Sequence, residues 1–366
     1  MLIAHTESSH GWGGQEIRIL TESKMLISRG HRIILLADPD SLIAQRAELY
    51  GVRVHPLRLE KKRLREVFAM RKALHSLKPD IVSTHSSTDH WVTALARLLI
   101  SSKPAIVRTR HISAPVSSNL ATRWLYRTGC EAVVTTGESI RQHLIESGLT
   151  DSHKARSVPT GIDLEDFGPR ARQAHGHIRA QLKANEAAMI FGNVATLRSW
   201  KGHHDLISAF AQISADVPQS RLLIVGDGPQ AESLRDLSKQ LGVGNRVIFV
   251  GHQQDVRQYF DAIDVFVFPS YANEGVPQAI LQAMACGLPI ITTAAGSIEE
   301  AVSDYPAATI VRPQRVDELA RAMFQFEDRR LVQRISLPKS VQERINITLM
   351  ADKMERVYQE VLTRSS

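Results

Sequence analysis

The feature that most constrains the fold of this chain is an alternation of short, β-branched apolar runs with helical segments, and this alternation occurs twice. Runs without a polar face are typical of parallel strands that helices cover on both sides. The first series of expected strands is 2–5, 32–37, 52–57, 80–85, 105–111 and 132–136. The second series is 188–195, 221–226, 246–251, 264–270, 288–293 and 308–311. The sequence therefore predicts an α/β chain with two Rossmann-like, doubly wound parallel sheets.

The length of the chain agrees with two domains, because 366 residues exceed what one hydrophobic core usually supports. A polar, glycine-containing segment from Glu165 to about Lys183 separates the two series and is expected to be a hinge. We expect an N-terminal domain over 1–166 and a C-terminal domain over 167–345, facing each other across a cleft. The amphipathic stretch 346–366 is expected to form a helix that packs back on the N-terminal domain.

Composition and charge narrow the class of protein. The chain is 43% hydrophobic and 23% charged, which is typical of a globular protein. No apolar run approaches the roughly 20 residues that span a bilayer, and the first residues lack the pattern of a secretory signal, so we expect a cytoplasmic location. The net charge of +7 indicates an anionic partner. Nucleic acid is not expected, since the 5% of aromatic residues are not interleaved with basic ones.

Loops beyond the carboxyl ends of the strands are the places where doubly wound sheets bind ligands. In TLRSWKGH, Arg198 and Lys201 precede a helix, so two cations and a helix dipole could converge on a diphosphate; a solvated basic loop is the alternative. In GWGGQE, Gly13 and Gly14 would allow a positive φ or a close backbone approach to a ligand. A tight turn without a ligand is the alternative interpretation of the same two glycines.

The segment NEGVPQAILQAMACGLP combines a carboxylate with the start and stop signals of a helix. Pro277 suits the first helical position and Gly287 the C-terminal cap, which predicts a helix over about 277–286. Glu274 precedes this helix, where it either interacts with the helix dipole or accepts hydrogen bonds from sugar hydroxyls. Gln282 lies two turns into the helix.

Taken in order, these segments resemble the retaining glycosyltransferases of family 4, which have the B-type fold of two Rossmann-like domains (GT-B). The resemblance covers nearly the whole chain. It rests on GGQEIRI, SVPTGIDLEDF, LRSWKGH, RLLIVGDGPQAESLRDLSKQLG, NRVIFVG, DVFVFPSYANEGVPQAILQAMACGLPIITT and GSIEEAV. It implies an enzyme that moves a sugar from a nucleotide-sugar donor to an acceptor with retention of configuration. It also implies that no metal and no cofactor is needed.

The resemblance assigns roles to matching positions. Lys201 and Arg198 would hold the donor diphosphate, Glu274 would bind hydroxyls of the transferred sugar, and His111 would face that sugar from the N-terminal domain. His85 matches the family less well, and a structural histidine at a strand end is the alternative for both histidines. The implied donor-binding positions are Gly13, Gly14, Thr196, Gly275, Val276 and Gln282.

Two positions in the second half depart from the family pattern. Gln282 replaces a family glutamate that bonds the ribose, so an uncharged amide oxygen would accept that hydroxyl. Thr196 replaces an arginine, for which Arg198 could compensate. These departures motivate the alternative of a non-catalytic paralogue that binds a nucleotide or glycan without transfer. At GSIEE, Ser297 and Glu300 predict a capping box, for which we prefer a structural role.

Basic residues mark the expected acceptor side. The stretch 59–80 reads as a basic amphipathic helix that could lie on anionic lipid headgroups, with a solvated helix face as the alternative. Its basic residues are Lys61, Lys62, Arg63, Arg65, Arg71 and Lys72, beside Leu64, Val67, Phe68 and Leu74. Further charge comes from Arg108, Arg110, Arg123 and Arg127. We expect a hexosyltransferase at the inner face of the cytoplasmic membrane that uses a saccharide or lipid-linked acceptor. Lipopolysaccharide biosynthesis is the leading hypothesis and a soluble acceptor the alternative.

Overall fold

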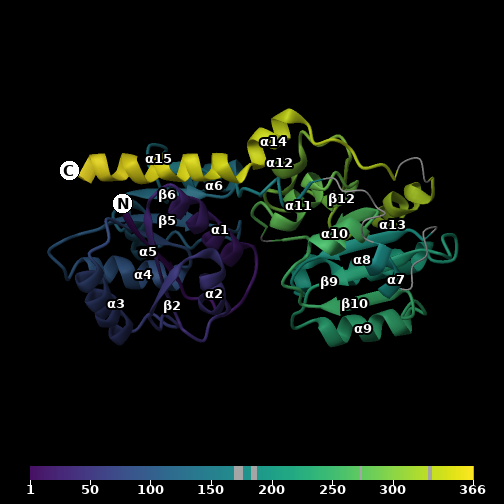
Figure 1. The fold of residues 1–366 in the computed structure, drawn as a ribbon, viewed down its shortest axis with the longest axis horizontal. Helices are drawn as coiled ribbons and strands as arrows, with labels where there is room; N and C mark the ends of the chain where they lie inside the picture. Colours follow the sequence, from purple (N-terminus) through teal and green to yellow (C-terminus); the bar gives the residue numbers. More distant parts are fainter. Residues whose placement is uncertain (169–175, 183–187, 273, 329–331, 366) are drawn as a thin grey trace. The chain divides into compact units, whose positions relative to one another are not determined.

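The computed structural model describes residues 1–366 except 169–175, 183–187, 273, 329–331 and 366. The chain divides into two compact units, shown in Figure 1. The first unit consists of Met1–Gly161 and Ile345–Ser366, and the second of Ile162–Arg344. Each unit contains one parallel sheet, so the predicted α/β class with two Rossmann-like sheets is confirmed.

The first unit has a seven-stranded sheet in the order β3-β2-β1-β4-β5-β6-β7. The strands are β1 Leu2–Glu7, β2 Arg32–Ala37, β3 Arg53–Pro56, β4 Ile81–Thr84, β5 Ala105–Arg110, β6 Ala132–Thr135 and β7 Ala155–Ser157. The helices are α1 Gly14–Ser28, α2 Leu42–Arg46, α3 Leu64–Leu77, α4 Ser87–Arg97, α5 Leu120–Arg127 and α6 Glu138–Glu146. The sequence predicted these strands except β7, which is a three-residue edge strand with a single buried residue.

The central strands of this sheet are buried on both faces, which explains their continuous apolar runs. Ile3 of β1 and Ile81 of β4 belong to one hydrophobic cluster, whereas the next residues, Ala4 and Val82, belong to another. Successive side chains of a strand point to opposite faces of the sheet. Each of the two helical layers therefore packs on an apolar surface of the sheet. The absence of a polar face on the strands predicted this arrangement.

The last helix, α15 Ile347–Ser365, packs on the first unit and lies against α1 (Figure 1). Met354 and Tyr358 of this helix are fully buried in the same cluster as Ile3. At the surface, Arg29 at the end of α1 pairs with Asp352 at 2.6 Å and with Glu355 at 2.9 Å. Buried apolar contacts and a rim of ion pairs thus join the end of the chain to its beginning.

The second unit has a six-stranded sheet in the order β10-β9-β8-β11-β12-β13. The strands are β8 Ile190–Val194, β9 Arg221–Val225, β10 Val247–Gly251, β11 Val265–Phe268, β12 Ile290–Thr293 and β13 Ala308–Val311. The helices are α7 Gly176–Gln181, α8 His203–Ile213, α9 Ala231–Gln240, α10 Arg257–Ala262, α11 Gln278–Ala285, α12 Ile298–Val302 and α13 Val316–Phe324, followed by α14 Lys339–Ile345. Across the described residues of both units, no helix combines the length and apolar character needed to span a membrane.

Part of the segment that we predicted as a hinge is a helix of the second unit. In α7, Arg179 is 4% exposed, donates to the carbonyl of Ala262 at 2.9 Å and pairs with Asp264 at 3.2 Å. This short helix buries a charged side chain beside the apolar Ile178, so its hydrophobic periodicity gave only a weak signal. The rest of the proposed hinge includes 169–175 and Lys183, which lie outside the described residues.

The packing of α15 makes a prediction about stability. We expect Met354→Ala to lower the free energy of unfolding of the first unit by about 2–5 kcal/mol, because truncating a fully buried methionine removes apolar contacts and leaves a cavity. Gln359→Ala changes an exposed residue of the same helix and should cost less than about 0.5 kcal/mol. Urea unfolding followed by circular dichroism measures both variants. Equal effects would show that α15 is not part of this core.

Candidate active site

The predicted donor-site residues of the second unit follow two neighbouring strands. Lys201 lies in the loop after β8, and Glu274 lies in the loop after β11. Strands β8 and β11 pair in parallel, so their carboxyl ends open at the same edge of the sheet. Two residues that are 73 positions apart in the sequence therefore meet.

Lys201 and Glu274 form an ion pair that is mostly buried. Lys201 Nζ lies 2.7 Å from Glu274 Oε1, and the side chains are 16% and 7% exposed. The same Oε1 lies 2.6 Å from the hydroxyl of Ser270, and Lys201 Nζ is 5.1 Å from the centroid of the Phe268 ring. An ammonium group has three donors, so the pair leaves Lys201 able to bind an anion. In the described structure Glu274 Oε2 accepts no hydrogen bond, so it can receive a hydroxyl.

Backbone contacts hold the two loops together. Tyr271 N–H donates to the carbonyl of Trp200 at 2.9 Å, next to Lys201. Gly202 has a φ of +72°, and a Cβ at this position would lie 2.1 Å from the carbonyl oxygen of Pro269. Only glycine therefore allows the lysine loop to lie this close to the end of β11.

A neutral histidine adjoins the lysine. Asn193 donates through Nδ2 to the carbonyl of Val267 at 2.7 Å, which turns its Oδ1 toward His203 Nε2 at 3.0 Å. Burial, followed by the nearby charge of Lys201, lowers the pKa of His203 to about 3. The imidazole therefore adds no positive charge at neutral pH. Sequence reasoning missed Asn193 and His203, although the histidine directly follows the lysine loop.

Arg198 lies apart from the Lys201–Glu274 pair. Its side chain is exposed, and the guanidinium stands 5.4 Å from the centroid of the Trp200 ring. Arg198 lines a cavity of about 250 Å³ together with Tyr271 and the first residues of α8, and that cavity does not include Lys201 or Glu274. Thr196 is half-buried in the same loop. Convergence of Arg198 and Lys201 on one diphosphate stays a prediction.

The helix predicted over about 277–286 is confirmed as α11, Gln278–Ala285, with Pro277 as its N-cap. Gly287 follows with a φ of +71°. Gly275 and Val276 are buried just before the helix, and Gln282 is half-buried within it. The implied ribose and sugar contacts of these residues remain predictions, because the structure holds no ligand.

The predicted capping box of Ser297 and Glu300 is wrong. Helix α12 begins after Ser297, but the Ser297 side chain makes no capping hydrogen bond. Its φ of −96° and ψ of 19° are not the extended values from which an N-cap side chain reaches the first turn. Instead the backbone N–H of Ser297 donates to the carbonyl of Glu274 at 3.3 Å. The segment thus supports the carboxylate loop through its backbone.

In the first unit, the two candidate histidines are in contact. His111 follows β5, His85 follows β4, and His85 Nδ1 lies 3.0 Å from His111 Nε2. The other nitrogen of His85 lies 2.9 Å from Nδ1 of His5, a residue that sequence reasoning missed. Burial lowers the pKa of all three rings, that of His5 to about 4. The three imidazoles are therefore neutral at pH 7.

The glycine loop of the first unit leads into α1. Gly13 is the N-cap with an extended φ of −167°, and Gly14 is the first helical residue. Neither glycine has a positive φ, so that part of the prediction is wrong. A Cβ at Gly14 would meet nothing within 4 Å, which leaves open space for a ligand there. A close approach of a ligand to this loop stays a prediction.

A buried carboxyl group shapes the same loop. Glu7 Oε1 accepts from the N–H groups of Ser8 and Ser9, each at 2.8 Å, and Oε2 contacts the amide of Gln15. Burial, together with Asp89 and Glu16, raises the pKa of Glu7 to about 8. Glu7 is the last residue of β1, and sequence reasoning did not single it out.

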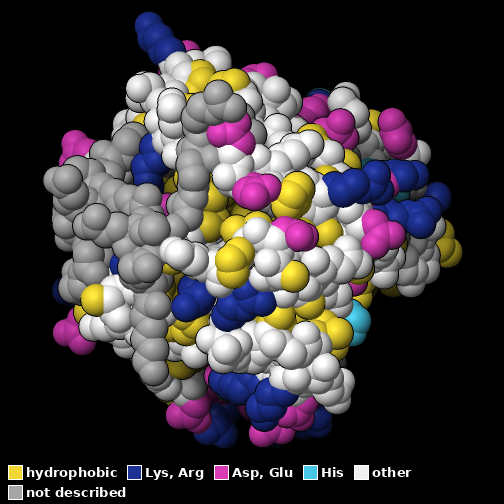
Figure 2. Space-filling model, turned by 90° about the vertical axis from the view of Figure 1, so that its right-hand side faces the viewer, with side chains coloured by type: hydrophobic (Ala, Val, Ile, Leu, Met, Phe, Trp, Pro, Cys, Tyr) yellow, Lys and Arg dark blue, Asp and Glu magenta, His cyan; other side chains and the backbone are white. Residues whose placement is uncertain are grey.

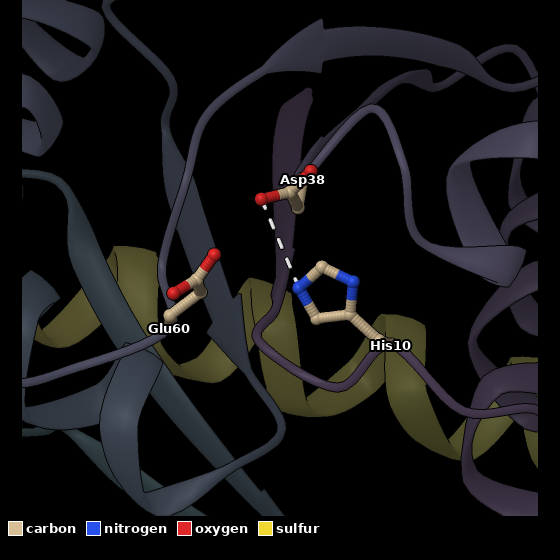
Figure 3. Close-up of side chains that lie close together, drawn as sticks. All are labelled: His10, Asp38 and Glu60. Atoms are coloured by element: carbon tan, nitrogen blue, oxygen red, sulfur yellow. Dashed lines mark ion pairs between the residues drawn. The ribbon is translucent and has the colours of Figure 1, made fainter.

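A further group of polar side chains lies after β1, β2 and β3. Ligand atoms of His10, Asp38 and Glu60 all lie within 4.8 Å of one another, and His10 Nε2 is 3.8 Å from Asp38 Oδ2 (Figure 3). Arg58 Nε also lies 3.8 Å from that oxygen. This guanidinium already balances the carboxylate that a metal ion would need, so we assign no metal to the group. Metal independence stays a prediction.

Comparison with known proteins identifies both halves of the chain. Residues 12–166 match the profile described as Glycosyltransferase Family 4, and residues 176–343 match Glycosyl transferases group 1. The D-inositol 3-phosphate glycosyltransferase of Corynebacterium urealyticum is 29% identical over 69% of this chain and 64% of its own length. The UDP-Gal:alpha-D-GlcNAc-diphosphoundecaprenol alpha-1,3-galactosyltransferase of Escherichia coli is 27% identical over 81% of this chain and 79% of its own length.

Solved structures agree on the fold. Anabaena Alr3699/HepE in complex with UDP-glucose superimposes with a TM-score of 0.86 at 22% identity, covering 98% of this chain and 100% of that one. The chain spans 45% to 64% of the length of the first curated relatives that it matches. Since two adjoining profiles of one enzyme class cover both parallel-sheet halves, the chain belongs to the family 4 glycosyltransferases of the two-domain, B-type fold.

Proposed function

We propose that this protein is a retaining glycosyltransferase that moves a hexose from a nucleotide-sugar donor to a saccharide or lipid-linked acceptor. The observation that carries the proposal is the Lys201–Glu274 pair at the carboxyl edge of the second sheet. Family membership supports it, as does the name of the Escherichia coli relative, which describes a UDP-sugar donor and a diphosphoundecaprenol acceptor. The Anabaena neighbour was crystallised with UDP-glucose. We propose a role in cell-envelope glycans, with lipopolysaccharide as the leading hypothesis.

The pair provides complementary contacts for a sugar diphosphate. As the bond between the sugar C1 and the diphosphate oxygen breaks, negative charge grows on the leaving group, and the ammonium of Lys201 stabilises it. Glu274 Oε2 accepts a hydroxyl of the sugar and so orients the reacting carbon. The acceptor oxygen bonds to C1 from the same face, and its proton passes to the departing diphosphate. No covalent sugar–enzyme intermediate is required in this sequence.

The remaining candidate residues would extend these contacts. The half-buried Gln282 would accept a ribose hydroxyl, and the N–H groups around Gly275 and Val276, before α11, would face the phosphates. Arg198 is exposed and therefore able to turn toward the diphosphate in place of the missing arginine at Thr196. In the first unit, His111 and the loop of Gly13 and Gly14 are proposed as ligand-binding positions.

Nucleotide binding tests the donor site. We expect one of UDP, GDP and ADP, or a sugar conjugate of it, to raise the melting temperature by several degrees, since a ligand at about 100 times its Kd stabilises by roughly 2.7 kcal/mol. Lys201→Ala should weaken the binding by about 1.5–3 kcal/mol, because it removes charged hydrogen bonds to the phosphates.

Each melting temperature is compared with that of the same variant without nucleotide, because Lys201→Ala also leaves Glu274 unpaired. Lys239→Ala is the control, since Lys239 pairs with Asp236 on an exposed face of α9 in the same unit. An unchanged shift in Lys201→Ala would remove Lys201 from the donor site. No shift with any nucleotide would favour the paralogue without activity.

The stereochemistry of the product tests the retaining mechanism. With an α-linked nucleotide sugar as donor and a panel of lipid diphosphate-linked monosaccharides as acceptors, we expect an α-linked product. The coupling constant of the anomeric proton in the NMR spectrum distinguishes the two configurations. A β-linked product would contradict attack from the face that the diphosphate leaves.

The first unit offers a surface for a membrane. On α3, Leu64 is 74% and Phe68 56% exposed, and at the end of the adjoining α4, Leu98 is 57% and Leu99 47% exposed. We call these residues, with the exposed Arg65, Arg71 and Lys72 of α3, the α3–α4 surface. Apolar side chains beside cations fit an anionic lipid surface. On the face drawn in Figure 2, Lys and Arg side chains occur both beside Asp and Glu and beside hydrophobic side chains. We therefore propose peripheral binding at the inner, cytoplasmic face of the membrane.

Vesicle binding tests the α3–α4 surface. We expect the protein to bind phosphatidylglycerol vesicles but not phosphatidylcholine vesicles in a flotation assay. The triple variant Arg65→Gln, Arg71→Gln, Lys72→Gln should bind less tightly by about 1 kcal/mol per cation removed. Lys239→Gln, in the second unit, should bind like the unmodified protein. Equal binding of the triple variant would exclude this surface, and an unmodified protein that binds no vesicles would favour a soluble acceptor.

A further inference from the structure

One arginine of the first unit is buried without a hydrogen-bond partner. Arg108 lies two residues after Ile106 in β5, so its side chain is on the sheet face that α3, α4 and α5 cover. It is 4% exposed, and its Nη1 is buried with no hydrogen bond. A guanidinium keeps its charge and has five N–H donors, so burying it with none of them satisfied by a described residue is costly.

Asp89 of α4 balances only part of this charge. Arg108 Nη1 lies 3.9 Å from Asp89 Oδ1, which is too far for a hydrogen bond. The carboxylate accepts from other donors instead. Oδ1 accepts from the N–H of Ser86 at 2.9 Å, and Oδ2 accepts from the hydroxyl of Thr6 at 2.9 Å and the N–H of His85 at 3.1 Å. Asp89 therefore serves the end of α4, and the hydrogen bonds of Arg108 remain unmade.

The first turn of α4 offers further donors beside Asp89. Ser86 and Asp89 form a reciprocal capping box, which satisfies the N–H groups of these two residues. The N–H groups of Ser87 and Thr88 make no hydrogen bond to any residue that the structure describes. Free N–H groups at the start of a helix carry partial positive charge and attract anions.

A second cation reaches this turn from the loop after β3. Lys62 Nζ donates to the hydroxyl of Ser87 at 3.1 Å and stands 5.6 Å from the centroid of the Trp91 ring. Trp91 stacks on Trp124 of α5, with ring centroids 6.0 Å apart. An ammonium group has three donors, so the bond to Ser87 leaves Lys62 able to bind an anion. Lys62 and Ser87 are exposed, so solvent reaches the turn from this side.

Positive charge exceeds negative charge at this turn. Partial burial, followed by the charge of Arg108, lowers the pKa of Lys62, so the two cations oppose each other. Among the described residues, Arg108 pairs with Asp89 alone and Lys62 pairs with no carboxylate. A phosphate group has several terminal oxygens, which can accept from a guanidinium, an ammonium and helix N–H groups together. Phosphate is therefore the ligand chemistry that fits this set of donors.

We propose that Arg108, Lys62 and the first turn of α4 form a phosphate-binding site, in which the phosphate completes the hydrogen bonds of Arg108. This α4 phosphate site holds the phosphate of the acceptor, which is either a lipid diphosphate-linked saccharide or a soluble phosphorylated saccharide. The assignment to an acceptor rests on the proposed function, whereas the binding of phosphate does not. Arg108 and Lys62 then restrict the acceptors to phosphorylated molecules.

Calorimetric titration with inorganic pyrophosphate tests the α4 phosphate site. The full chain carries Lys201→Ala, so that the donor site of the second unit contributes less binding. Arg108→Gln in this background should weaken the binding of pyrophosphate about tenfold or more, the change expected for the loss of charged hydrogen bonds. Unchanged affinity in Arg108→Gln would overturn the proposal, as would the absence of pyrophosphate binding before that change.

A matched pair of lysines keeps the test independent of folding, because Arg108→Gln also leaves Asp89 without its cation. Lys62→Gln changes an exposed side chain and should weaken pyrophosphate binding about three- to tenfold, less than the arginine variant because water and salt screen an exposed charge. Lys61→Gln removes the same charge from the preceding exposed residue and should leave the affinity unchanged. Equal affinities of the two lysine variants would overturn the proposal.

Two phosphate esters separate the sources of the phosphate. Geranyl diphosphate represents a lipid diphosphate, and glucose 1-phosphate represents a soluble phosphorylated saccharide. The ester that binds more tightly, with an affinity that falls in Lys62→Gln, identifies the acceptor class and supports the site. Binding of pyrophosphate but of neither ester would overturn the assignment to an acceptor. Absence of sugar transfer by a protein that binds phosphate would instead overturn the proposed function.

Discussion

The central constraint in the candidate site is a charged pair withdrawn from water. Removing an ammonium and a carboxylate from water costs several kcal/mol for each ion, and their attraction offsets this only when the geometry is good. Ser270 at 2.6 Å and the glycine at position 202 provide that geometry for Lys201 and Glu274. An apolar pair would fill the same space without this cost. The charges are therefore best explained by a ligand that needs a cation and an acceptor side by side.

The fold could be predicted because its main signal is local. A strand buried on both faces is mostly apolar, so β11 can be recognised from a few residues. The prediction failed for a short helix that buries a charged side chain and for a strand with too few residues. Helix α7 is short and buries the charged Arg179 beside Ile178, and β7 is a short edge strand.

The site was predictable only in its parts. Loop positions at strand ends and the helix signals of α11 identified Lys201 and Glu274, but their 2.7 Å contact depends on which strands are neighbours. Arg198 lines a cavity that does not include Lys201, and whether the two cations converge on one diphosphate stays a prediction. Ser297 has the residue type of an N-cap, yet its backbone angles exclude that role. Residue type and spacing do not determine the angles or the partners.

The first unit shows how distant parts of a chain meet in buried polar contacts. A lone histidine at a strand end has two tautomers of similar energy, and its surroundings choose between them. In this unit His111 contacts His85 and His85 contacts His5, while the hydroxyl of Tyr358 in α15 donates to the carboxyl group of Glu22 in α1. The buried contacts that dock α15 also place that hydroxyl. The apolar packing of this unit and its buried Tyr358–Glu22 hydrogen bond therefore depend on the same helix, and a change that loosens the helix would alter both.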